Sequence, residues 1–115
     1  MRAAIAKARE AQPRWAARSF AERAVYLDRL RELLLARTDE IMTTLAKETG
    51  KADMECLSEI FGACDSLQYY AKHAAKILRK VPKRAHLFFP FKKLVKSYRP
   101  RGVVGVIIPW NFPFA

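Results

Sequence analysis

The chain has 115 residues, of which 51% are hydrophobic and 29% charged, so it is long enough for one small domain with a modest core. Its mean hydropathy of -0.14 is that of an ordinary globular protein, which excludes a disordered chain. No apolar run approaches the roughly 20 residues that a membrane-spanning helix needs, so no membrane association is expected.

The net charge of +11 is distributed unevenly along the chain. Residues 1–65 contain 11 Lys or Arg and 11 Asp or Glu, whereas residues 66–115 contain 11 Lys or Arg and no acid. One interpretation is a surface that binds nucleic acid or an anionic membrane. The other is that the acidic partners of this region lie on further chain or on another subunit. The charge pattern alone does not choose between them.

Cys56 and Cys64 lie in a segment whose pattern predicts one helix, which separates them by about 12 Å along the helix axis. A disulfide cannot span that distance, and the spacing is not that of metal ligands. We therefore expect two buried thiols, no metal site and an intracellular, cytoplasmic location. Met1 leads into a polar, charged segment that is unlike a secretory signal. Its basic residues bear a faint likeness to a mitochondrial transit peptide, but they equally fit a surface helix.

Two helices are predicted at the N-terminal end. The first covers residues 2–12 and ends near Pro13, because proline disrupts a helix interior. Ser19 and Glu22 have the spacing of a capping box, so a second helix is expected to start there. Its apolar positions follow helical spacing: Phe20, Ala24, Leu27, Leu30 and Leu34.

Two more helices are predicted before the pattern changes. Thr38 and the two acids after it favour a helix N-terminus, and Gly50 is a residue type common just beyond a helix end. A long fourth helix is predicted over residues 52–80, followed by the terminating Pro82. One apolar stripe runs along it: Cys56, Ile60, Ala63, Leu67, Tyr70, Ala74 and Ile77.

The last third of the chain has the texture of strands and loops. Residues 83–90 are predicted to form a basic, aromatic loop, and residues 92–99 alternate as a strand with one solvated side. Residues 103–108 read Val-Val-Gly-Val-Ile-Ile, which is typical of a strand buried on both faces of a parallel sheet. The loop at residues 109–113 follows, at the edge where α/β folds bind ligands. A buried parallel strand needs neighbours, and no second strand of that kind is present, so the sheet is predicted to be incomplete.

Residues 99–113, which read RPRGVVGVIIPWNFP, resemble the segment that aldehyde dehydrogenases carry at the start of their dinucleotide-binding domain. Upstream pieces agree in order and spacing. Residues 16–34, with their Glu-Arg pair, resemble the family's second helix, residues 48–51 resemble the turn before its long helix, and residues 67–70 resemble the middle of that helix. The resemblance covers nearly the whole chain but only about the first quarter of a family member.

The resemblance implies an α/β fold in which these N-terminal helices precede the first strand of a Rossmann-like cofactor-binding domain. Within residues 1–115, residues 1–82 would be helical and residues 83–101 would form a projecting β oligomerisation segment. Residues 102–115 would supply the first parallel strand and its Pro-Trp-Asn-Phe-Pro loop. A homo-oligomer, dimer or tetramer, would follow, and its subunit contacts would explain the basic region without a nucleic-acid or membrane partner.

The family oxidises an aldehyde to a carboxylic acid with NAD or NADP as acceptor, through a thiohemiacetal on a cysteine. The oxyanion of that intermediate needs a preorganised donor, and a neutral carboxamide donates without transferring a proton. By resemblance, Asn111 is this oxyanion donor, and Ile108, Pro109 and Trp110 flank the cofactor beside it. Phe112 matches a residue that lines the aldehyde tunnel, with the fourth helix as another wall. A plain packing role for Phe112 remains open.

The family's nucleophilic cysteine, general-base glutamate, ribose-binding lysine and glycine-containing cofactor turn lie downstream of the matched segment. Neither Cys56 nor Cys64 has the sequence context of that nucleophile, so the isolated chain is expected to be inactive. The alternative is a stand-alone basic helical module that binds nucleic acid or anionic surfaces. The Gly50-Lys51 pair lacks the rest of a P-loop, and His73 and His86 are expected on a helix surface and in a loop.

Overall fold

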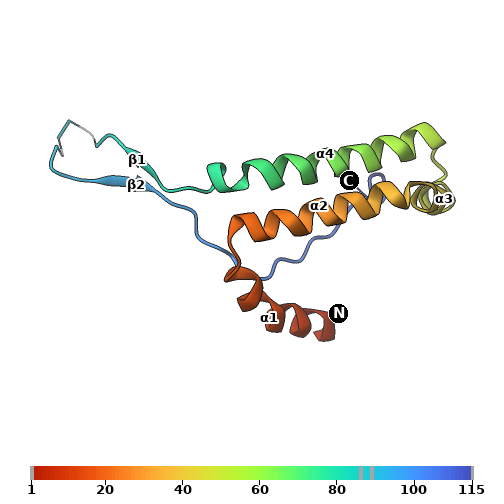
Figure 1. The fold of residues 1–115 in the computed structure, drawn as a ribbon, viewed down its shortest axis with the longest axis horizontal. Coiled ribbons are helices and arrows are strands. Elements are labelled where there is room, and N and C mark those ends of the chain that lie inside the picture. The colour runs from red at the N-terminus through yellow and green to blue at the C-terminus, as the bar shows by residue number, and fades with distance from the viewer. Residues whose placement is uncertain (1, 86, 89, 115) are drawn as a thin grey trace.

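The computed structural model describes residues 2–85, 87–88 and 90–114. Its order is α1 (Arg2–Ala16), α2 (Phe20–Ala36), α3 (Thr38–Thr49), α4 (Asp53–Ile77), β1 (Val81–Lys83) and β2 (Leu94–Lys96). Helices α2 and α4 lie side by side, α3 joins them at one end, and the β1–β2 hairpin projects beyond the other end of α4 (Figure 1). The structure is therefore a helical unit with a small two-stranded sheet, which is consistent with part of an α/β domain.

Helix α1 runs through Pro13 to Ala16, so the predicted end near Pro13 is wrong. Proline removes the hydrogen bond that its own nitrogen would donate, but its carbonyl can still accept one. The backbone N–H of Ala17 donates to the Pro13 carbonyl at 3.0 Å. The last turn therefore closes on the C-terminal side of the proline.

The predicted capping box at the start of α2 is confirmed. The backbone N–H of Glu22 donates to Ser19 Oγ at 3.2 Å, and the Ser19 N–H donates to Glu22 Oε2 at 2.8 Å. These reciprocal bonds satisfy backbone donors that the first helical turn leaves without intrahelical partners.

The predicted bounds of α3 are confirmed and those of α4 only in part. Helix α3 starts at Thr38 and ends before Gly50, which has φ 71° and ψ 14°, a left-handed conformation that glycine adopts without steric cost. Helix α4 ends at Ile77, earlier than the predicted residue 80, and Pro82 lies inside β1. A two-stranded ribbon tolerates proline, because each strand has a free edge.

The hairpin pairs β1 with β2 in an antiparallel register that joins Val81 to Lys96 and Lys83 to Leu94. Strand β1 is missing from the sequence prediction, which assigned a loop from residue 83, and the predicted strand over residues 92–99 shortens to Leu94–Lys96. The hairpin does project from the helices (Figure 1). His86 lies outside the described residues.

The predicted buried strand at residues 103–108 is not formed. These residues have no strand assignment, and the side chain of Ile107 is 99% exposed. A strand interior is stable only when its backbone groups pair with neighbouring strands. In the described part of the chain the only sheet is the β1–β2 hairpin, so this apolar run has no sheet to join.

The core lies where α3 and α4 meet the end of α2. Its buried members are Leu45, Cys56, Ile60 and Cys64. Both cysteines are free thiols, as predicted. Along the predicted α4 stripe, Cys56 and Ile60 in the first half are buried, whereas Tyr70 and Ile77 in the second half are exposed. His73 is exposed on α4, as predicted, and its ring lies 4.7 Å from that of Tyr69.

Replacing Ile60 by Ala tests this core. Ile60 is 1% exposed whereas its neighbour Phe61 is 72% exposed, so Ile60→Ala should lower the free energy of unfolding by about 2–5 kcal/mol. Phe61→Ala is the matched control and should change it far less. Urea unfolding followed by circular dichroism measures both, and equal losses would contradict the assignment of the core.

The capping box gives α2 a dependence on pH. The hydrogen bond from the Ser19 backbone, followed by that from the Ser19 side chain, lowers the pKa of Glu22 below its ordinary value. Ionised Glu22 therefore stabilises the helix fully above its unfolded-state pKa, and this contribution is lost as the pH falls through the lowered folded-state pKa. We expect Glu22→Gln to flatten the acid limb of a plot of melting temperature against pH. Glu32→Gln, at an exposed position of α2, is the control and should leave that limb steep.

Candidate functional site

The predicted site residues lie on a tight turn near the C-terminal end. The Phe112 N–H donates to the Pro109 carbonyl at 3.4 Å, which closes a turn around Trp110 and Asn111. Trp110 is 83% exposed, and Asn111 and Ile108 are also exposed. The turn therefore presents the carboxamide and the indole to the outside of the helical unit.

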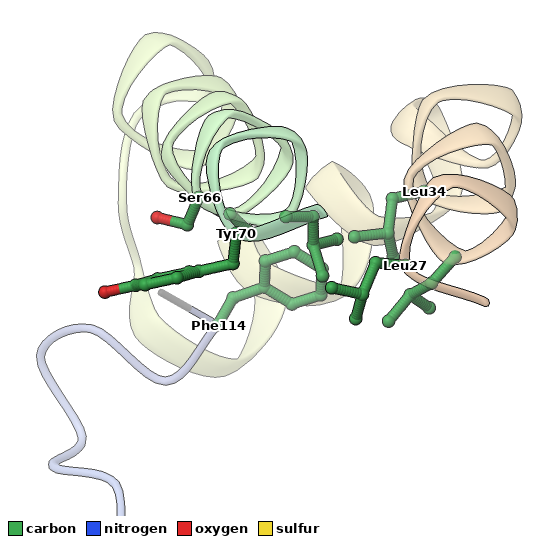
Figure 2. Close-up of a pocket in the computed structure, with 8 residues that line it drawn as sticks. Leu27, Leu34, Ser66, Tyr70 and Phe114 are labelled. Atoms are coloured by element: carbon green, nitrogen blue, oxygen red, sulfur yellow. The ribbon is translucent and has the colours of Figure 1, made fainter. Parts of the chain in front are cut away.

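The turn is attached to the helices through Phe114. Its backbone N–H donates to Glu59 Oε2 on α4 at 3.2 Å, a bond between residues 55 positions apart. Its ring enters a groove between α2 and α4, with Tyr70 and Ser66 on one side and Leu27 and Leu34 on the other (Figure 2). The groove has a volume of about 470 Å³ and an almost wholly apolar lining: Leu27, Leu30, Leu34, Ala63, Ser66, Leu67, Tyr70 and Phe114.

Glu59 is 3% exposed and is the buried charged residue of the described chain. A buried carboxylate is costly unless a countercharge and hydrogen-bond donors compensate it. Lys51, whose side chain is 17% exposed, forms an ion pair with Glu59 Oε1. Glu59 thus uses one oxygen for Lys51 and the other for the C-terminal segment.

Lys51 also contacts the predicted site directly. Its ammonium nitrogen lies 4.2 Å from the centroid of the Phe112 ring, which is a cation–π contact. Lys51 follows the left-handed Gly50 and precedes α4, so the turn between α3 and α4 delivers it to this position. The structure therefore brings together Lys51, Glu59, Phe112 and Phe114.

The sequence prediction found the loop but missed Lys51 and Glu59. Glu59 follows Cys56 by three positions and precedes Ile60, so it is an acid within the apolar face of a helix. Such a residue is almost never buried without a partner, and this signal could have singled it out. Lys51 belongs to the turn at residues 48–51 that resembles the family's, but it is not among the predicted site residues. Phe112 is 54% exposed and its ring contacts the Lys51 ammonium, and its role in a tunnel stays a prediction.

The described residues contain no group of three or more His, Cys, Asp or Glu side chains placed to hold a metal ion. No helix in the same residues has the length and apolar character to cross a membrane.

Comparison with known proteins identifies the family. The sequence profile described as "Aldehyde dehydrogenase family" matches residues 1–115. The chain belongs to the aldehyde dehydrogenase family. The resemblance carried by residues 99–113 is thereby confirmed, and the family is one of oxidoreductases.

Among aldehyde dehydrogenase relatives, a putative succinate-semialdehyde dehydrogenase [NADP(+)] of Mycolicibacterium smegmatis is 45% identical over 114 residues, covering 98% of this chain and 22% of its own length. A putative succinate-semialdehyde dehydrogenase [NADP(+)] 2 of Mycobacterium ulcerans is 39% identical, covering 96% of this chain and 21% of its own length. The 4,4'-diapolycopene aldehyde oxidase of a Methylomonas species is 38% identical with the same coverage. The chain thus spans about a fifth of the length of these relatives. No solved structure matches it.

Proposed function

We propose that this chain is the N-terminal part of an NADP-dependent dehydrogenase that oxidises a semialdehyde to a carboxylic acid. The observation that carries the proposal is the exposed Pro-Trp-Asn-Phe-Pro turn in a chain that matches the family along all its residues. The semialdehyde and NADP follow the names of the similar mycobacterial proteins. NAD is the other acceptor that the family resemblance allows.

In this proposal Asn111 is the oxyanion donor. Attack of a thiolate on an aldehyde carbonyl places negative charge on the carbonyl oxygen, and a fixed carboxamide N–H stabilises that charge without giving up a proton. Pro109 and Pro113 restrict the backbone on either side of Asn111, and the bond between Pro109 and Phe112 closes the turn. An exposed carboxamide on a fixed turn is open to an approaching carbonyl group.

The residues before Asn111 fit one edge of a dinucleotide. Ile108, Pro109 and Trp110 are exposed, and they offer a backbone carbonyl as hydrogen-bond acceptor and a flat indole ring for packing. The family's glycine-containing turn and ribose-binding lysine would hold the other parts of the cofactor. When bound, the nicotinamide dinucleotide accepts a hydride. Phe112, next to the donor, would limit the space on the aldehyde side.

The β1–β2 hairpin is the proposed oligomerisation segment. It projects from the helices (Figure 1) and exposes Leu94 and Val95 together with neighbouring basic residues. Pairing with a neighbouring subunit of a cytoplasmic dimer or tetramer would cover these apolar side chains and the basic residues. A stand-alone module that binds nucleic acid or anionic surfaces would use the same charges, but the family match over the whole chain favours the subunit contact.

The proposal predicts no turnover by the isolated 115-residue chain. Both of its cysteines are buried in the helical core, so neither thiolate can reach an aldehyde beside Asn111. Incubation with succinate semialdehyde and NADP should give no NADPH above the rate without protein, measured by absorbance. Aldehyde-dependent NADPH formation by the purified chain would contradict the assignment.

A chimera tests Asn111 itself. In it this chain replaces the matched segment of the Mycolicibacterium smegmatis relative, and NADPH formation is followed at steady state. Asn111→Ala should lower kcat by about 10²–10³-fold, because one oxyanion donor is lost. Gln12→Ala, which removes a carboxamide from α1, is the control and should leave kcat within about twofold of the parent if only the donor at Asn111 matters. An Asn111→Ala chimera as fast as its parent would refute the role.

A further inference from the structure

We propose that the Lys51–Glu59 ion pair positions the Asn111 turn, so that these two residues act on the reaction through the oxyanion donor. The inference rests on the proposed function for its catalytic consequence. Its structural basis is independent of that function, because it consists of contacts from Lys51 and Glu59 to Phe112 and Phe114.

Glu59 is buried in α4. Its two oxygens face two different segments, since Oε1 pairs with Lys51 at the start of α4 and Oε2 accepts the N–H of Phe114. Loss of either partner would leave a buried carboxylate partly uncompensated. The helical unit and the C-terminal segment are therefore linked through one buried charge.

Three contacts are placed around Asn111. The turn bond joins Pro109 to Phe112, the Lys51 ammonium lies against the Phe112 ring, and the Phe114 N–H is held by Glu59. Asn111 lies inside the turn, directly before Phe112 and three positions before Phe114. Its carboxamide is exposed, so these neighbours fix its location while it stays accessible.

The side chain of Phe114 makes an apolar contact. It occupies the apolar groove between α2 and α4, opposite Leu27 and Leu34 (Figure 2). This packing favours docking of the segment but does not set the orientation of the preceding turn, because apolar contact is not directional. The directional contacts are the hydrogen bond to Glu59 and the cation–π contact from Lys51. The geometry thus separates docking, which Phe114 provides, from orientation, which the ion pair provides.

A purely structural role for the pair would be to hold α4 against the turn that precedes it. The two roles predict different changes when the charge of Lys51 is removed. A structural tie would loosen the helices and the loop together. A positioning pair would release Phe112, Phe114 and Asn111 while the buried face of α4 stays protected.

The first experiment measures amide hydrogen exchange and the Asn111 side-chain amide signals by NMR on the full 115-residue chain. In the unsubstituted chain, the Phe114 amide should be protected. Lys51→Met, which keeps the aliphatic stem, should raise the exchange rate of the Phe114 amide about tenfold or more and shift the Asn111 signals, while the exchange rates of the Cys56 and Ile60 amides change far less. Lys51→Arg should restore the protection of the Phe114 amide and the Asn111 signals. Lys47→Met, at an exposed lysine of α3, is the matched control.

Three results would overturn the proposal in this experiment: an unprotected Phe114 amide in the unsubstituted chain, unchanged Asn111 and Phe114 signals in Lys51→Met, or equal loss of protection in the loop and in α4. Glu59→Gln separates the two contacts. It keeps an acceptor for the Phe114 N–H but removes the countercharge of Lys51, so the Phe112 and Asn111 signals should shift more than the Phe114 amide.

The second experiment measures kinetics in the chimera with the Mycolicibacterium smegmatis relative. A displaced oxyanion donor slows the chemical step, so Lys51→Met should lower kcat by about 10-fold to 100-fold with KM changed less than threefold. Lys51→Arg should recover most of the loss, and Lys47→Met should match the parent. An unchanged kcat, or a loss confined to KM, would refute the catalytic consequence.

The two proposals fail in different ways. If Asn111→Ala leaves kcat unchanged while Lys51→Met still releases the Phe114 amide, the oxyanion role is wrong and the tether stands. If Asn111→Ala lowers kcat but Lys51→Met changes neither kcat nor the loop signals, the oxyanion role stands and the positioning role is wrong.

Discussion

The placement of the C-terminal segment against the helices depends on one buried carboxylate. Glu59 lies in the apolar face of α4, where an unpaired charge would be strongly unfavourable. The structure compensates it from two directions, with the Lys51 ammonium and with the Phe114 N–H. Because these partners come from the turn before α4 and from the far end of the chain, compensation of a single charge brings the start of α4 and the C-terminal segment together. Apolar packing of Phe114 between α2 and α4 strengthens this contact, but its geometry is set by the charge.

The same C-terminal segment contains an apolar run that the fold leaves exposed. Residues 103–108 have the composition of a doubly buried strand, yet the side chain of Ile107 is almost fully exposed. Helices satisfy their own backbone groups, so α1 to α4 form from local sequence and modest packing. A parallel strand needs other strands, and the described residues supply only the separate hairpin. The helical part of the domain is therefore formed while the sheet part is not.

The sequence predicts best what is decided locally. The capping box of Ser19 and Glu22 and the left-handed end at Gly50 are confirmed, because each depends on a few neighbouring residues. Strand β1 was missed, since its pairing with β2 depends on a partner that lies beyond the intervening loop, and the run at 103–108 was assigned from composition without its partners. The loop residues from Ile108 to Phe112 are predicted as site residues through the family resemblance, and that role stays a prediction. Lys51 and Glu59 are not predicted as site residues, because their contacts join positions far apart in sequence.

The exposed turn around Asn111 is held by the helices and not by a sheet. In α/β folds, the loops that follow parallel strands take their orientation from the sheet. Here the turn around Asn111 contacts the helical unit directly, through Phe112 and Phe114, and it does so without strand pairing at residues 103–108. In the described residues, the C-terminal side of this turn is held from the helices by the Lys51–Glu59 pair. For the proposed role of Asn111 as an oxyanion donor, such holding matters because a fixed dipole does not have to reorganise when a negative charge forms beside it.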